Sequence, residues 1–422
     1  MIPAAERVIL VGLEHEGVSR WDLADSLDEL RQLADTAGAR VVETVVQRLD
    51  KPTAPYYIGK GKAEEIAKTS GEKQASSVIF DDELSPAQSR NLEELTNRKV
   101  IDRTQLILDI FASRARTREG RLQIELAQLQ YLLPRLTGMW SHLSRQTGGI
   151  GTRGPGETQL EVDRRRVQDR IARLERELAE VRKHRGIQRE GRLRHNWPFV
   201  SLVGYTNAGK SSLLNRLTGS AVEARDRLFE TLDPTTRQIT LPNHQKVLLT
   251  DTVGFIRKLP HTLIESFKAT LEEVQLANLL IHVVDLAHPR HADQIEAVDA
   301  VLGELDAQGK QTIMVFNKCD LVTDPEIVQS NLARYPGSVA VSAHTGEGVP
   351  RLIEELEIRL AAWRMQGRFE IPLTEPALLA ELHRVGHVLD LKYGESTAMI
   401  TAHIPPELIG RLSKYDAGSP AK

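Results

Sequence analysis

The sequence has few of the features that mark secreted or membrane-spanning chains. Its 422 residues include one cysteine, Cys319, which excludes an internal disulfide and fits a reducing compartment. No signal peptide is evident, and no apolar run reaches the ~18 residues that a membrane-spanning helix needs. We therefore expect a cytoplasmic protein, and a partly membrane-peripheral location stays open.

A strong excess of charge of one sign is also missing. The formal net charge is −3 and the isoelectric point is about 6.5, so bulk charge does not mark a nucleic-acid-binding protein. Any contact with nucleic acid must come from local basic patches. The hydrophobic content of 41% is ample for packed cores, and the length predicts two to four domains.

A glycine-containing stretch at residues 204–211 has the pattern G-x-x-x-x-G-K-[ST] of a phosphate-binding loop. The apolar run 198–203 before it predicts a strand, and residues 212–217 predict the start of a helix. In such a loop Lys210 would reach the β- and γ-phosphates and Ser211 would hold Mg²⁺. An ordinary turn is the structural alternative. The predicted nucleotide contacts are Gly204, Tyr205, Thr206, Asn207, Ala208, Gly209, Lys210 and Ser211.

A second motif, Asp251-Thr252-Val253-Gly254, follows the apolar run 247–249. Its carboxylate could reach Mg²⁺ through water, and its glycine would let the backbone approach the γ-phosphate. Asn317-Lys318-Cys319-Asp320 follows a predicted strand at 312–316. A carboxylate there can accept two hydrogen bonds from guanine N1 and N2, a donor pair that adenine lacks.

A further segment, Ser342-Ala343-His344, follows the apolar run 339–341, and its backbone could bind guanine O6. The order and spacing of these four segments resemble the G1, G3, G4 and G5 motifs of translation-factor-like GTPases. A small-molecule kinase would not need the Asn-Lys-x-Asp segment. The sequence therefore predicts a guanine-nucleotide site.

Switch I is the segment whose threonine completes the Mg²⁺ ligands when the γ-phosphate is present. The position of this threonine is less evident from the sequence than the four motifs above. Thr231 is preferred because its Phe-x-Thr-Leu-Asp-Pro context resembles switch I of one GTPase family, and Thr235 is the second candidate. Thr235 and Thr236 are also expected to be turn residues around Pro234. The predicted GTP contacts in this segment are Phe229, Glu230, Thr231, Leu232 and Asp233.

Residues 1–117 alternate strand-like and helix-like stretches, with strands expected at 7–12, 41–46, 77–80 and 100–101. Repeated β–α units predict a small, mostly parallel α/β domain. The segment Ile58-Gly59-Lys60-Gly61-Lys62 could hold a phosphate of a nucleotide or of RNA, although such a segment is more often a flexible turn before a helix. No motif locates a second nucleotide site there.

Residues 118–195 predict two long helices that pack as an antiparallel hairpin, since leucines recur at helical spacing in 120–146 and 157–185. A glycine-rich loop, 148–156, lies between them. The arginines of the second helix could be a solvated face or a site for RNA phosphates. The candidate RNA contacts are Gly149, Arg153, Gly154, Arg164, Arg165 and Arg166.

The remaining chain is predicted to form a GTPase domain at 196–365 and a small α+β domain at 366–415, with a hairpin around Gly394. The tail 416–422 is expected to be disordered. The whole is thus an α/β chain with a P-loop GTPase domain.

The G motifs, the segment 148–166 and the segment Tyr56–Lys62 together resemble the HflX family over nearly the whole chain. The resemblance implies a GTPase that binds the 50S ribosomal subunit and dissociates stalled or stress-damaged 70S ribosomes, with Ser211 and Thr231 as Mg²⁺ ligands. Glu230 departs from the family, which often has a small residue there. The predicted catalytic residues are Lys210, Thr231, Asp251 and Gly254.

Phe255 occupies the position where Ras-like enzymes carry a water-orienting glutamine, so we expect slow intrinsic turnover that ribosomes stimulate. Asn207 resembles an asparagine that coordinates K⁺ in some GTPases lacking this glutamine, or it only stabilises the loop. We expect a monomer. An alternative function is a GTPase in RNA modification or in a membrane-associated process, with the flanking domains as adaptors.

Overall fold

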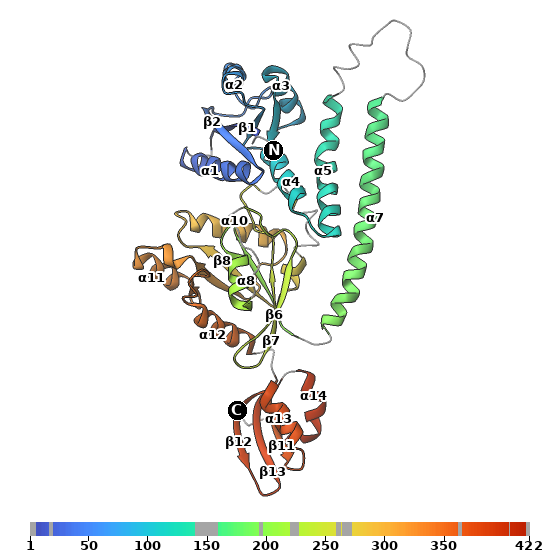
Figure 1. Ribbon diagram of the computed structural model, residues 1–422, viewed down its shortest axis with the longest axis vertical. Helices are drawn as coiled ribbons and strands as arrows, with labels where there is room; N and C mark the ends of the chain where they lie inside the picture. Colours follow the sequence, from blue (N-terminus) through green and yellow to red (C-terminus); the bar gives the residue numbers. More distant parts are fainter. Residues whose placement is uncertain are drawn as a thin grey trace, which may run out of the picture. The chain divides into compact units, whose positions relative to one another are not determined.

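The computed structural model describes residues 6–16, 20–139, 159–193, 197–219, 228–258, 263, 272–361, 365–404 and 406–418 (Figure 1). The chain divides into two compact units. The first unit holds Met1–Val181 together with Asp226–Leu232 and Lys258–Lys268. The second holds Arg182–Arg225, Asp233–Arg257 and Ala269–Lys422.

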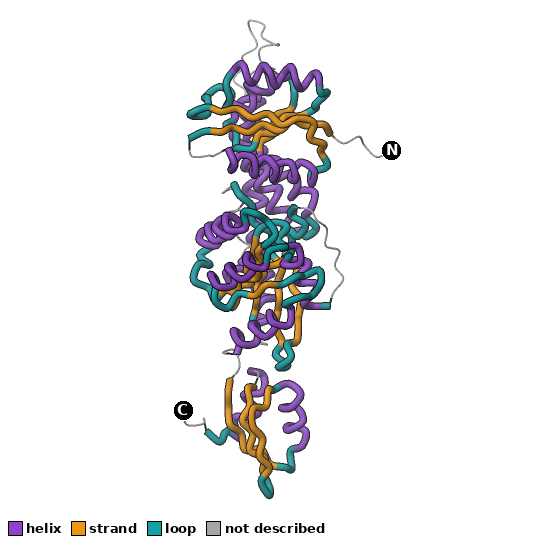
Figure 2. The backbone as a smooth tube through the Cα atoms, turned by 90° about the vertical axis from the view of Figure 1, so that its left-hand side faces the viewer, coloured by secondary structure: helices purple, strands orange, loops and turns teal. Residues whose placement is uncertain are grey.

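The first unit contains a four-stranded sheet in the order β2-β1-β3-β4, with all neighbours parallel. Figure 2 shows helices on both sides of this sheet. Its strands and helices alternate as predicted: β1 (Glu6–Glu14), α1 (Arg20–Thr36), β2 (Ala39–Arg48), α2 (Lys60–Glu72), β3 (Ser77–Phe80), α3 (Pro86–Thr96), β4 (Lys99–Asp102) and α4 (Arg103–Arg114). Local sequence explains the helix starts, since Ser85 and Gln88 form a capping box at α3 and Asp102 caps α4. The expected parallel α/β architecture is confirmed.

The two long helices α5 (Arg118–Met139) and α7 (Gln159–Leu193) lie side by side (Figure 1). Their leucine stripes meet in a small core of Leu122, Leu126, Leu174 and Leu178. The Arg170 guanidinium also forms two hydrogen bonds with Glu125, of 2.7 and 2.9 Å. The predicted hairpin is confirmed for these helices, whereas its glycine-rich loop lies outside the described residues.

One arginine attaches α5 to the sheet of the first unit. Arg135 donates from Nη2 to the Leu84 carbonyl at 2.8 Å and to the Asp102 carboxylate at 3.2 Å. Its guanidinium also stacks on the Tyr131 ring, 3.5 Å from the ring centre. Because Asp102 ends β4, this contact joins the helical hairpin to the carboxyl edge of the sheet.

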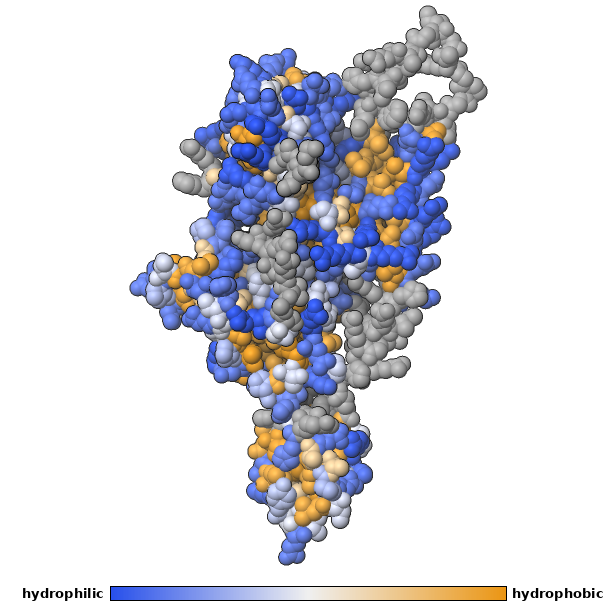
Figure 3. All heavy atoms as spheres, in the orientation of Figure 1, coloured by the Kyte–Doolittle hydropathy of each residue, from blue (hydrophilic) through white to orange (hydrophobic). Residues whose placement is uncertain are grey.

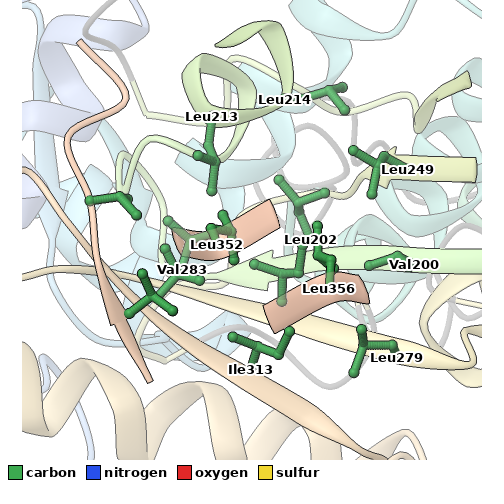
Figure 4. Packing of buried hydrophobic residues seen from close by; sticks show 14 of the residues in the cluster. Val200, Leu202, Leu213, Leu214, Leu249, Leu279, Val283, Ile313, Leu352 and Leu356 are labelled. Atoms are coloured by element: carbon green, nitrogen blue, oxygen red, sulfur yellow. The ribbon is translucent and has the colours of Figure 1, made fainter. Parts of the chain in front are cut away.

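The second unit contains a six-stranded sheet in the order β10-β9-β8-β5-β7-β6, in which only β6 is antiparallel to its neighbour. Figure 4 shows Leu352 and Leu356 packing over the central strands near Leu213. The elements are β5 (Phe199–Gly204), α8 (Lys210–Thr218), β6 (Thr235–Thr240), β7 (Lys246–Asp251), β8 (Leu279–Asp285), α10 (His291–Glu304), β9 (Thr312–Asn317), α11 (Pro325–Arg334), β10 (Val339–Ala340) and α12 (Val349–Leu360). All parallel strands therefore end at one edge, where the motif residues follow them.

The C-terminal segment forms a small antiparallel sheet in the order β11-β13-β12. Its elements are β11 (Met365–Pro372), α13 (Pro376–Val385), β12 (His387–Tyr393), β13 (Thr397–Ile404) and α14 (Pro406–Leu412). The expected hairpin around Gly394 is confirmed. The expectation of disorder directly after Tyr415 is wrong, because Asp416 bridges to Phe369 and the Ala417 N–H donates to the Arg368 carbonyl at 2.8 Å. These residues use the free edge of β11, which a reading of local composition cannot detect.

Within the described ranges, no helix is both long and apolar enough to cross a membrane.

Candidate nucleotide-binding site

The predicted phosphate-binding loop lies between β5 and α8, as its sequence requires. Gly209 precedes α8 with φ of +90°, a conformation that favours glycine. A Cβ atom on Gly209 would lie 2.2 Å from Nδ2 of Asn317, so the loop and the guanine-motif strand approach too closely for any side chain. The helix N-terminus thus presents its backbone N–H groups at the carboxyl edge of the sheet, where phosphates bind in such folds.

Lys210 and Ser211 occupy the first turn of α8. The Lys210 ammonium is buried and donates to the carbonyls of Gly204 and Tyr205 at 3.1 and 2.8 Å. Burial lowers the pKa of Lys210 to about 8, and the nearby Asp251 charge opposes that shift. The Ser211 hydroxyl donates to the Asp251 carboxylate at 2.6 Å. Mg²⁺ prefers oxygen ligands such as hydroxyl and carboxylate groups. Ser211 and Asp251 therefore fit the predicted metal.

Switch II is the segment that begins with the Asp251–Gly254 motif. Its first residues are hydrogen-bonded to the phosphate loop. The Thr206 N–H donates to the Phe255 carbonyl at 2.7 Å, and the Phe255 N–H donates to the Gly204 carbonyl at 3.1 Å. The Arg257 N–H donates to the Tyr205 hydroxyl at 2.8 Å. Gly254 lies so close to the phosphate loop that a Cβ atom on this residue would be 2.8 Å from Thr206 Cα. The Asp-x-x-Gly glycine is therefore required for this close approach.

The Phe255 side chain is 1% exposed. Since it is buried and apolar, it cannot orient a water molecule. This agrees with the expected absence of the Ras-type glutamine function. The Tyr205–Arg257 hydrogen bond was not predicted, and no sequence pattern marks it.

On the guanine side, Asn317 joins two loops. Its Nδ2 donates to the Ala208 carbonyl at 2.8 Å, and its Oδ1 accepts from the Ala343 N–H at 3.0 Å. Lys318 donates to the Asp285 carboxylate at 2.7 Å. Asp320, the last residue of this motif, is exposed, and its contact with a guanine base stays a prediction. The structure therefore brings the G1, G4 and G5 segments together.

The switch I segment is divided between the two units. Phe229, with Glu230, Thr231 and Leu232, belongs to the first unit, where the Phe229 ring packs edge-on against Phe111 at 4.6 Å, and Asp233 belongs to the second. The role of Thr231 as a Mg²⁺ ligand stays a prediction.

The expectation that Thr235 and Thr236 are turn residues is wrong. Both residues begin β6, opposite Asp251 and Thr250 of β7. The Thr236 hydroxyl lies 2.7 Å from the Thr250 hydroxyl. Strand pairing with β7 thus overrides the local turn signal of Pro234.

Comparisons with known proteins agree over nearly the whole chain. Residues 24–112 match the family described as GTP-binding GTPase N-terminal, residues 114–192 match GTP-binding GTPase Middle Region, and residues 199–318 match 50S ribosome-binding GTPase. A GTPase HflX from Escherichia coli is 48% identical over 416 residues, covering 98% of this chain and 97% of that protein. The chain belongs to the HflX family of GTPases. A GTPase HflX from Lacrimispora saccharolytica is 47% identical over 97% of this chain and 96% of its own length.

Among solved structures, a GTP-binding protein from Sulfolobus solfataricus in complex with GDP is 25% identical. That match covers 84% of this chain and 98% of the archaeal chain, with a TM-score of 0.44. As an HflX-family GTPase, the chain binds guanine nucleotide and hydrolyses GTP to GDP and phosphate.

The candidate RNA contacts of this HflX-family chain lie in the helical hairpin. Arg164, Arg165 and Arg166 are exposed on α7, and the outer face of α7 is mostly hydrophilic in Figure 3. Gly149, Arg153 and Gly154 lie outside the described residues. The other candidate segment, Ile58–Lys62, forms the start of α2, with Gly59 as the N-cap and Lys60–Lys62 in the first helical turn. The Gly59 N–H donates to Gln47 Oε1 at 2.8 Å, and Ile58 is fully buried.

Proposed function

We propose that this GTPase is a nucleotide-dependent switch that binds the 50S ribosomal subunit and dissociates stalled or stress-damaged 70S ribosomes. The match of residues 199–318 to a family described as 50S ribosome-binding GTPase supports a ribosomal partner. The observation that carries the proposal on this chain is the run of exposed arginines on α7, since arginine binds phosphate bidentately.

The arginine face extends over several turns of α7. Besides Arg164–Arg166, the side chains of Arg173 and Arg176 are exposed. An exposed arginine that releases counterions from a phosphate backbone adds affinity that falls steeply with salt. The hairpin is therefore suited to ribosomal RNA, whereas the net charge of −3 gives the whole chain no overall attraction to RNA.

The first unit contains residues of both switch segments. Lys258 lies in switch II, three residues after Phe255, and forms ion pairs of 2.5 Å with Asp81 and Asp82, at the carboxyl end of β3. Burial raises the pKa of Asp81, and the Lys258 charge lowers it. Phe229 of switch I packs on Phe111 of α4. Because both segments continue along the chain into the second unit, a change in either switch on GTP binding would reach the first unit through the chain itself.

In the reaction, Lys210 would stabilise charge on the transferred phosphoryl group, and Ser211, Asp251 and Thr231 would hold Mg²⁺ directly or through water. The metal would neutralise charge on the β- and γ-phosphate oxygens. Gly254 would let the switch II backbone approach the γ-phosphate. Because Phe255 is buried, the intrinsic rate would be slow, and ordering of the switches by the ribosome would raise it.

The test is sedimentation of the full chain with 70S ribosomes through a sucrose gradient in K⁺ buffer. With a non-hydrolysable GTP analogue we expect the protein to migrate with 50S subunits and the 70S peak to shrink. With GDP we expect most of the protein at the top. Protein that stays at the top with both nucleotides would contradict the proposal.

A charge-matched pair of variants tests the arginine face. Replacing Arg164, Arg165 and Arg166 together by alanine should weaken 50S binding and reduce its salt dependence by up to about three counterions. The control replaces the three exposed arginines Arg334, Arg351 and Arg411 of the second unit by alanine. Equal effects of the two triple variants would show that total charge, and not the α7 face, governs binding.

A further inference from the structure

The loop that contains the G5 motif, residues 342–347, uses four of its six backbone N–H groups in hydrogen bonds within the loop. The N–H groups of Ser342 and Gly346 donate to the carbonyls of Glu347 and Ser342. The Thr345 N–H donates to the Ser342 hydroxyl at 3.0 Å, and the Glu347 N–H donates to the Thr345 hydroxyl at 3.3 Å. These internal hydrogen bonds define the shape of the loop.

Two donors of this loop remain to be assigned. The Ala343 N–H donates to Asn317 Oδ1 at 3.0 Å. Among the residues that the structure describes, the His344 N–H is the loop donor with no hydrogen bond, and His344 is exposed. The Asp-containing motif that ends at Asp320 is bonded to the residue directly before this loop, because the Cys319 N–H donates to the Val341 carbonyl at 3.2 Å. The open donor thus belongs to the loop beside the predicted base-binding carboxylate.

One arginine of α8 holds the carbonyl side of this loop. Arg216 donates from Nε to the Ala343 carbonyl at 3.0 Å, and its Nη2 contacts the His344 carbonyl. Arg216 follows the phosphate-binding lysine by less than two helical turns on α8. The arginine therefore connects the phosphate-binding helix to the G5 loop.

We propose that Arg216 is a positioning residue for guanine, which orients and polarises the His344 N–H so that it donates to guanine O6. This inference rests on the assignment of the guanine site. The Ala343 carbonyl and the His344 N–H belong to the same trans peptide group, so they point in opposite directions. A guanidinium that holds the carbonyl fixes the direction of the N–H. A charged donor on the carbonyl also makes the N–H of that peptide a stronger donor.

The test compares GDP with 6-thio-GDP, in which sulfur, a weak acceptor, replaces O6 and the N1 and N2 donors stay. Dissociation constants are measured by calorimetry on the full chain. For Arg216→Ala we expect GDP binding to weaken about tenfold, the scale of one charge-assisted hydrogen bond. Binding of 6-thio-GDP should weaken less than about threefold, because this ligand makes little use of the His344 N–H. Arg216→Lys, which keeps a cation for one carbonyl, should give an intermediate preference for GDP.

A general structural role predicts a different pattern. If Arg216→Ala weakens both nucleotides equally, or neither, the proposal is overturned. Retained binding of 6-thio-GDP shows that the variant is folded. The control Arg351→Ala removes an exposed arginine, paired with Glu354, from the first turn of α12, the helix that follows the loop in the chain, and should change neither constant.

A third variant separates this proposal from the guanine assignment itself. Asp320→Asn removes the predicted contact to N1 and N2, which both nucleotides share, so it should weaken both to the same degree. If Asp320→Asn leaves both nucleotides unaffected, the guanine assignment fails, and the role of Arg216 fails with it.

Discussion

A buried histidine in the sheet of the GTPase unit predicts a measurable dependence of stability on pH. His282 lies in β8 and is 2% exposed. Burial, and secondarily the Lys210 charge, lowers the pKa of His282 to about 3. In the unfolded chain its pKa would be about 6.5. Because the unfolded state takes up the proton first, acidification below about pH 6.5 favours unfolding, and this continues until the folded-state pKa is reached.

The magnitude follows from the two pKa values. Between pH 7.5 and pH 5.0, proton binding by the unfolded state lowers the free energy of unfolding by about 2 kcal/mol for this single group. Any folded-state pKa below about 4 gives the same result at pH 5.0. His282→Gln cannot titrate, so the variant should lose about 2 kcal/mol less than the parent over this interval, whatever its stability at pH 7.5.

The assay is urea unfolding at both pH values, followed by pulsed hydrogen exchange of the backbone amides of Leu279–Asp285. This readout reports on the stability of the sheet that contains His282, and the difference between parent and variant isolates the contribution of His282. The control is His244→Gln, which replaces an exposed histidine in the turn between β6 and β7 and should keep the parental pH dependence. If His282→Gln loses as much stability as the parent between the two pH values, the buried neutral histidine does not drive the effect.

Three further predictions concern the nucleotide site. Phe255→Gln should not raise the rate of single-turnover GTP hydrolysis, because the side chain at this position is buried. The variant should also lower the free energy of unfolding by about 2 kcal/mol. A tenfold faster hydrolysis would contradict the first of these predictions. Asn207 is exposed in the phosphate loop. If it binds K⁺, the parent should hydrolyse GTP about tenfold faster in K⁺ than in Na⁺, and Asn207→Asp should lose this difference. Equal hydrolysis rates of parent and variant in both salts would refute the role. Gly209→Ala should weaken GDP binding by about tenfold or more, because alanine disfavours a φ of +90° and its Cβ would displace the Asn317 side chain. An unchanged GDP affinity in a calorimetric titration would disprove the steric argument.

Local patterns in the sequence were sufficient for the parts of the fold that local chemistry determines. The strand before Gly204 and the helix after Gly209 follow from an apolar run and a glycine-rich turn. The strands that precede Asp251, Asn317 and Ser342 were found in the same way, and their parallel pairing brings the motif ends to one edge. The leucine spacing similarly predicted the contact between α5 and α7.

The contacts that the sequence did not predict join residues far apart in the chain. Arg216 and Ala343 are 127 residues apart, and neither carries a motif or a periodic pattern that points to the other. The Pro234 turn signal misled the interpretation of Thr235 and Thr236, because pairing with β7 depends on a tertiary partner. For the same reason, composition could not show that Ala417 bonds to β11.

The attachment of α5 through Arg135 has a consequence for recognition. Through its contacts with Leu84, Asp102 and Tyr131, Arg135 holds helix α5 in a fixed orientation against the N-terminal sheet. A large partner that contacts both surfaces then needs to immobilise them only once, since their mutual orientation is already set when the chain folds. Less conformational entropy is lost on association, and a modest number of contacts on each surface can act together as one binding site.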